Sequence, residues 1–241
     1  MQPHSDTHVN LPHLEQPFGQ LFFPLEEHGQ SKQRRGHKQH SRFFQVLTML
    51  TQVLQAKDVQ LYTHSYHVYI LVSQLTKALH LNEKERRTIE LAALFHDIGK
   101  ITIHNTVLNK PSRLTQHEFD LIREHPGHGA RIVAQSKHLK KVAPLIYSHH
   151  ERWDGDGYPY RLREEAIPLG ARIIAIVDTF DVITSQRAYK AASSIAQGLT
   201  ELRRCAGTQF DPVLVNMFCT TQENALRSSR QELCQQIEKF I

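Results

Sequence analysis

The sequence predicts an all-α protein on three observations. Apolar residues recur three and four positions apart along most of the chain from Phe43 onward, as on one face of a helix. Residues typical of helix starts precede some of these runs, namely Asn82 and the pair Thr115 and Glu118. The almost continuously apolar run 169–183 has no partner strand elsewhere in the chain, and its length favours a buried helix.

The 241 residues can form one or two domains, and a hydrophobic content of 40% supports a sizeable core. Residues 1–40 carry four prolines and scattered Gln and His, so we expect a poorly ordered N-terminal arm there and one helical domain over 41–241. No run approaches the ~18 apolar residues of a membrane span, and the first residues do not resemble a secretory signal. Three cysteines without CxxC spacing predict reduced thiols in a cytoplasmic protein.

The net charge of +5 suits an anionic ligand. Much of it lies in the basic stretch 32–38, which has no aromatic residue to stack on a base, so we expect no duplex nucleic acid as a partner. The unusual feature is the number of histidines, 17 in all, because several of them follow the helical pattern of the core.

The expected elements can be placed in order along the chain. Thr115 opens a helix that reaches His125, where Pro126 and Gly127 are expected to end it. A long loop over 152–168 separates the histidine-rich half from the apolar run. The remaining helices are expected over 43–54, 61–79, 83–98, 128–135, 139–150 and 169–183, with two or three more over 193–240 and a loop over 101–114.

The most informative stretch is 94–100, at the end of the helix that Asn82 begins. His96 continues the apolar face of that helix, so it and Asp97 are expected to point into the core. A buried ionised carboxylate costs several kcal/mol unless it is paired or binds a metal. Gly99 is expected to break the helix, and Lys100 brings a cation to the same place.

Further His and Asp residues share this inward position on separate predicted helices. Each alone is best explained as a core residue with a hydrogen bond, but together they favour a metal centre. Nitrogen and oxygen ligands without a thiolate suit Fe, Mn or Zn. Seven candidates are too many for one metal, so two metals are expected. The seven candidates are His64, His96, Asp97, His125, His149, His150 and Asp178.

These residues and several short motifs resemble the HD phosphohydrolase superfamily and, within it, the HD-GYP family. The motifs are the stretch 96–100, the pair His149 and His150, the segment 151–159 that ends in Gly157, Tyr158 and Pro159, and the segment 209–212. The resemblance covers about residues 41–220. It implies an HD-domain helical bundle with additional C-terminal helices, two or three metals, and hydrolysis of cyclic di-GMP to linear pGpG and GMP.

The resemblance also implies roles for individual residues. The seven candidates would be metal ligands, with Asp97 bridging the metals and acting in catalysis together with Lys100. Lys100 would also contact a phosphate, and Arg187 and Lys190 would form a second phosphate-binding pair. Tyr158 would face the substrate or a partner, although Gly157 and Pro159 around it can equally set a structural turn.

Three positions depart from the family pattern. Ala188 replaces a usual proline, and His67 stands where arginine is common. Gln60, one turn before His64, stands where members with three metals place a glutamate ligand. An amide is a weak ligand for a hard cation, so we expect two divalent metals per chain, Fe or Mn, with Zn, Ni or Co as alternatives.

Three functions therefore stand as hypotheses. The first is a metal-dependent phosphodiesterase that hydrolyses cyclic di-GMP in second messenger signalling. The second is the same chemistry on another cyclic dinucleotide or a nucleotide phosphate. The third is a non-catalytic signalling or interaction module on the same scaffold. The family also suggests GGDEF-domain or other signalling proteins as partners, while the sequence leaves the oligomeric state and the regulatory input open.

Overall fold

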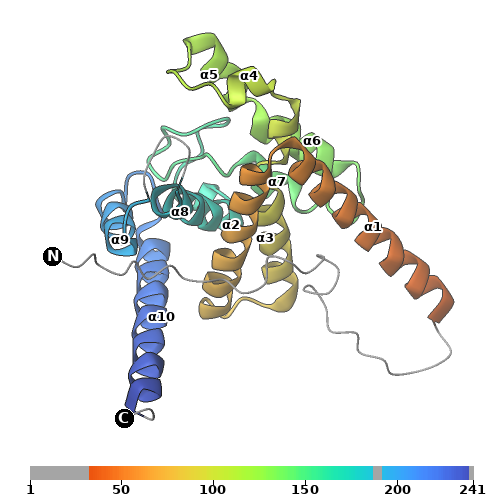
Figure 1. Ribbon diagram of the computed structural model, residues 1–241. Helices are drawn as coiled ribbons and strands as arrows, with labels where there is room; N and C mark the ends of the chain where they lie inside the picture. Colours follow the sequence, from red (N-terminus) through yellow and green to blue (C-terminus); the bar gives the residue numbers. More distant parts are fainter. Residues whose placement is uncertain (1–32, 187–191, 239–241) are drawn as a thin grey trace. The chain divides into compact units, whose positions relative to one another are not determined.

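The computed structural model describes residues 33–186 and 192–238, with side chains over 42–186 and 192–228. The chain divides into two compact units, Met1–Gln52 and Val53–Ile241, and the boundary between them falls within the residues of the first helix. The predicted division at residue 41 stays a prediction. The elements, drawn in Figure 1, are α1 (Gln33–Lys57), α2 (Val59–Ala78), α3 (Glu83–Phe95), η1 (Ile98–Thr102), α4 (Asn105–Leu108), α5 (Gln116–Arg123), α6 (His125–Ala134), α7 (Ala143–Tyr147), η2 (Glu164–Ala166), α8 (Leu169–Thr184), α9 (Ile195–Arg204) and α10 (Pro212–Glu238).

The all-α prediction is confirmed. Within the described ranges, pairing between extended residues is limited to one isolated bridge between Ala206 and Phe210. The core of the second unit forms where α2 packs against α3 and α8, and α8 is the buried helix expected from the apolar run. The fully buried side chains there include Val68, Val72, Leu75, Ala92, Ala93, Ile173, Ile174 and Val177. No helix among the described residues is long and apolar enough to cross a membrane.

Local chemistry sets where three of the helices begin. The side chains of Asp58, Asn82 and Thr115 each accept a hydrogen bond from a backbone N–H in the first turn of α2, α3 and α5. Glu118 bonds back to the backbone N–H of Thr115 and completes a capping box. The two helix starts that the sequence predicted at Asn82 and Thr115 are thereby confirmed.

The predicted boundary around His125 is wrong. Helix α5 ends at Arg123, and His125 is the first residue of α6 rather than the last of α5. Pro126 lies in the first turn of α6, where a residue without an N–H loses no helical bond. Pro126 therefore opens a helix instead of ending one.

Two further boundaries differ from the sequence prediction. The helix expected over 139–150 is reduced to the five residues of α7, which has Pro144 in its first turn, so His149 and His150 lie in the turn that follows. The loop expected over 101–114 contains the short helix α4, because the side chain of His104 accepts a bond from the backbone N–H of Thr106 and caps it.

Gly99 does not break a helix as expected. Helix α3 already ends at Phe95, and Gly99 lies inside the short 3₁₀ helix η1. A Cβ at this position would overlap the carbonyl oxygen of His125, so the missing side chain lets η1 pack directly against α6. This close contact holds the turn after Asp97 against the start of α6.

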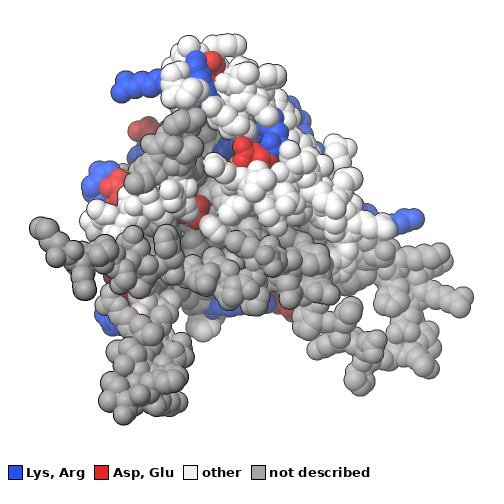
Figure 2. Space-filling model, viewed as in Figure 1, with Lys and Arg blue, Asp and Glu red and all other residues white. Residues whose placement is uncertain are grey.

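Charges of both signs lie on the surface. On the face drawn in Figure 2, the Lys and Arg side chains of the described residues are interspersed with Asp and Glu side chains. Among the described residues, the positive charges on this face are therefore not gathered into one broad basic surface.

Candidate metal centre

The structure brings six of the seven candidate ligands together in two groups. His64 from α2, His96 at the end of α3 and Asp178 from α8 form the first group. The second group consists of His125, His149 and His150. Within each group, the candidate ligand atoms all lie within 4.8 Å of one another, which is close enough for one metal ion.

Asp97, the seventh candidate, lies between the two groups. Its Oδ1 is 3.2 Å from Nε2 of His125, in the second group. Its Oδ2 is 3.4 Å from Nε2 of His96 and 3.9 Å from Nε2 of His64, in the first group. The two oxygens of one buried carboxylate thus face different groups, so Asp97 would be able to hold a cation in each of them.

Three of the histidines are fixed by the backbone of their own turn. Nδ1 of His96, His125 and His149 each lies 2.6–2.7 Å from the carbonyl oxygen three residues earlier. Because a carbonyl oxygen only accepts hydrogen bonds, Nδ1 carries the proton in each ring. Nε2 is then left as a lone-pair donor that points into the centre.

The surroundings of the three Nε2 atoms indicate whether a cation fits the site. Nε2 of His96 is buried without a hydrogen-bond partner. Nε2 of His125 lies 3.3 Å from Nε2 of His149, so two lone pairs face each other. A divalent cation would satisfy all three atoms, and imidazole and carboxylate are common ligands of Fe, Mn and Zn. The donor set therefore fits the expected metals.

Asp181 contacts the centre and was missed by the sequence reasoning. Nδ1 of His64 donates to its Oδ2 at 2.7 Å, and the hydroxyl of Ser185 donates to its Oδ1 at 2.9 Å. Nδ1 of His67 lies 3.4 Å from the same Oδ1. Because Asp181 follows Asp178 by three residues on α8, the two side chains share a helix face, and that spacing was the available signal.

Without metal, burial and neighbouring charges shift the pKa values of His64 and of His149 and His150 in opposite directions. Burial alone would lower the pKa of His64, but its hydrogen bonds with Asp178 and Asp181 outweigh this and raise the pKa to about 9. Burial, followed by the neighbouring His125, lowers the pKa of His150 to about 3. Burial likewise holds the pKa of His149 well below its usual value. At neutral pH, His149 and His150 are therefore neutral and can bind a cation.

Lys100 reaches the centre as expected. Its Nζ lies 2.6 Å from Oδ2 of Asp97, and its side chain is partly exposed. Burial works against ionisation of Asp97, but Lys100 and the nearby histidines hold the pKa of that carboxyl well below its usual range. Asp97 is therefore an anion at neutral pH. Arg187 and Lys190, the expected second phosphate-binding pair, lie outside the described residues.

Tyr158 packs against the second group. Its ring stacks on that of His150 with 5.0 Å between the centroids, and its backbone N–H donates to the carbonyl oxygen of His150. The guanidinium of Arg123 lies 4.5 Å from the centre of the same ring, a contact that nothing in the sequence indicated. Burial raises the pKa of Tyr158, so its hydroxyl remains a donor.

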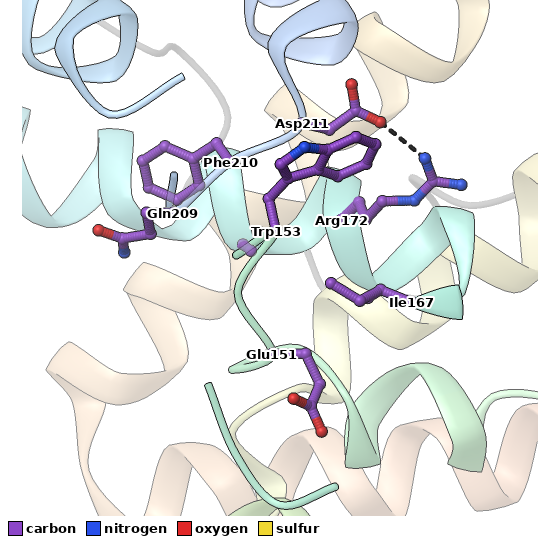
Figure 3. A pocket seen from close by; sticks show the side chains of 8 residues that line it. Glu151, Trp153, Ile167, Arg172, Gln209, Phe210 and Asp211 are labelled. Atoms are coloured by element: carbon purple, nitrogen blue, oxygen red, sulfur yellow. Dashed lines mark hydrogen bonds and ion pairs between the residues drawn. The ribbon is translucent and has the colours of Figure 1, made fainter. Parts of the chain in front are cut away.

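The loop after His150 is held by a separate network. The carboxylate of Glu151 accepts bonds from the backbone N–H groups of Tyr160 and Leu162, at 2.6 and 3.1 Å. Figure 3 shows Arg172 paired with Asp211, at 2.7 Å, in a pocket that the indole of Trp153 also lines. These contacts fix the segment that carries His149, His150 and Tyr158.

Comparisons with known proteins agree with this geometry. A family model described as HD domain matches residues 48–214. A cyclic di-GMP phosphodiesterase of Thermotoga maritima is 33% identical over 191 residues, covering 78% of this chain and 52% of the relative. Another, of Pseudomonas aeruginosa, is 39% identical over 166 residues, covering 68% of this chain and 40% of the relative.

A solved structure shares the fold as well. It is a cyclic GMP-AMP-specific phosphodiesterase of Vibrio cholerae, with a TM-score of 0.56 and 26% identity, covering 73% of this chain and 47% of that one. The chain therefore spans about half or less of the length of each of these three proteins.

Proposed function

The chain belongs to the HD domain family and to its HD-GYP group, and from this premise we propose that it is a metal-dependent phosphodiesterase. Its substrate would be cyclic di-GMP, as the names of the Thermotoga and Pseudomonas relatives suggest. The product would be linear pGpG, GMP or both. The observation that carries the proposal is the position of Asp97, whose two oxygens face two separate groups of nitrogen and oxygen ligands.

The proposal includes two divalent cations per chain, which this arrangement supports. One would be held by His64, His96 and Asp178, the other by the three-histidine group, and both by Asp97. The absence of a thiolate among these ligands favours Fe or Mn, with Zn, Ni or Co as alternatives. When bound, such a pair supplies an activated water nucleophile and stabilises charge on the phosphoryl oxygens.

The chain's own residues bind and orient the substrate. Lys100, partly exposed beside Asp97, would contact the phosphate under attack. Arg187 and Lys190 would bind the other phosphate of a cyclic dinucleotide, which carries two. Tyr158, held over His150, would present its ring and hydroxyl at the edge of the same site.

Cyclic GMP-AMP is a second candidate substrate. The observation in its favour is the Vibrio cholerae structure, whose named substrate it is. A non-catalytic module is less favoured, because such a module has no need of a complete ligand set. We place the reaction in the cytoplasm, since Cys205 and Cys219 are free thiols. Association with GGDEF-domain proteins stays a prediction.

The test is a product assay on protein that is purified anaerobically and loaded with Mn²⁺ or Fe²⁺. We expect cyclic di-GMP to be converted to pGpG or GMP, with a higher kcat/KM than for cyclic GMP-AMP. The reverse preference would support the second candidate. Metal-loaded, helical protein that cleaves neither substrate would contradict a catalytic function.

A further inference from the structure

His64 differs from three other histidines of the centre in the group that fixes its ring. His96, His125 and His149 each donate Nδ1–H to a carbonyl oxygen of their own turn. Nδ1 of His64 instead lies 2.7 Å from Oδ2 of Asp181, on a different helix. The ring of His64 therefore depends on a side chain of α8 for its orientation, while its own backbone belongs to α2.

Asp181 is buried but does not belong to either ligand group. Oδ2 is occupied by His64, and Oδ1 by the hydroxyl of Ser185, with Nδ1 of His67 3.4 Å away. These donors compensate the cost of burying the carboxylate. Both of its oxygens are thereby engaged by side chains.

We propose that Asp181 is a positioning residue for the metal centre, which fixes the Nδ1–H tautomer of His64 and aims its Nε2 at the group formed with His96 and Asp178. This inference rests on the proposed function, because it requires that the group binds a cation. A carboxylate behind a ligating histidine fixes the ring and increases its basicity. Asp181 therefore strengthens one of the two metal positions and leaves the three-histidine position unaffected.

Four variants test this role. Asp181→Ala removes the contacts with His64, Ser185 and His67, whereas Asp181→Asn keeps the shape and an acceptor but removes the charge. Ser185→Ala is the matched control, because it removes a contact on Oδ1 and leaves the contact to His64 intact. Glu90→Gln controls for the loss of a buried carboxylate, since Glu90 is buried and bonded to Ser73.

The experiment titrates Mn²⁺ into metal-stripped protein and follows binding by calorimetry and thermal unfolding with and without metal. We expect Asp181→Ala to weaken one of two metals per chain by about 10–100-fold and to leave the other unchanged. Asp181→Asn should weaken the same metal by a smaller factor, and it serves as the test if the alanine variant does not fold. Both controls should bind two metals with wild-type affinity.

Several outcomes would overturn the inference. The first is wild-type affinity for both metals in folded Asp181→Ala or Asp181→Asn. The second is an equal loss at both positions together with a lower melting temperature of the metal-free variant, which would indicate a merely structural role. In either case, wild-type protein that binds two metals and hydrolyses cyclic di-GMP leaves the proposed function intact. A wild-type chain without metal affinity would overturn both proposals.

Discussion

His125 and His149 point the same ring nitrogen at each other, with 3.3 Å between their Nε2 atoms. Each ring donates its Nδ1–H to a backbone carbonyl, so neither Nε2 has a proton to share. Two facing lone pairs in a buried site destabilise the metal-free protein, and a cation between them removes the repulsion.

Metal binding should therefore stabilise the fold. At 100 times its dissociation constant, one bound ion adds about 2.7 kcal/mol. For a chain of this size, that corresponds to a rise of about 5–10 °C in melting temperature. Thermal unfolding in Mn²⁺ and in EDTA measures the difference. Identical melting temperatures would contradict a metal centre in the folded chain.

The metal-free chain should be most stable near pH 6.5. Because the pKa of His64 is raised to about 9, its protonated ring stabilises the folded state. This contribution to the free energy of unfolding is complete below about pH 6.5 and is lost as the pH rises through 9. The lowered pKa of His150, about 3, means that the unfolded state takes up a proton first, so stability is lost as the pH falls below about 6.5.

Urea unfolding in EDTA between pH 5 and pH 9.5 tests this profile. In the His64→Gln variant, the loss on the alkaline side should be smaller than in wild type, since the proton held by His64 is gone. If both proteins lost the same stability between pH 7 and pH 9.5, His64 would not be the group responsible.

Lys100→Ala and Arg187→Ala should have different kinetic effects. A charged contact that is equally strong in the ground and transition states affects mainly KM, so Arg187→Ala should raise KM about tenfold with little change in kcat. Lys100 lies beside Asp97, so its loss should lower kcat by about tenfold or more. Loss of metal from Arg187→Ala with an unchanged KM would show that its assigned role is wrong.

The wild-type protein should bind two metals per chain. Gln60 lies in the first turn of α2, one turn before His64, and is exposed. Its amide offers only a carbonyl dipole to a third cation, whereas Gln60→Glu would add a full charge and should increase occupancy of a third position. Elemental analysis of the wild type and of Gln60→Glu measures the number of metals per chain. Three tightly bound metals in the wild type would show that Gln60 does not set the count.

The sequence predicted which candidate ligands come together better than it predicted the helices that carry them. Helical spacing placed Asp178 correctly on α8, because that helix is long and regular. The same reasoning put His149 and His150 on a helix, but α7 ends at Tyr147 and the two residues lie in a turn. Short helices depend on Pro positions and packing more than on periodicity, so their ends could not be read from the pattern.

Two contacts between distant segments were not predicted. Asp181 and His64 are 117 residues apart in the chain, and only the packing of α2 against α8 brings them together. Gly99 was interpreted as a local helix breaker, whereas its role is to allow the close approach of η1 to α6. In both cases the residue was interpreted from its neighbours in the sequence, whereas its role depends on residues that contact it in the folded chain.

The central claim is that Asp97 joins two metal ions in a hydrolytic centre. Metal content and cyclic di-GMP turnover should therefore be measured on the same anaerobic preparations of wild type and Asp97→Ala, with helicity checked by circular dichroism. We expect about two metals per wild-type chain, fewer in the variant, and turnover lower by about 100-fold or more, because both positions lose the ligand they share. A helical Asp97→Ala protein that keeps two metals and near-wild-type turnover would contradict the claim.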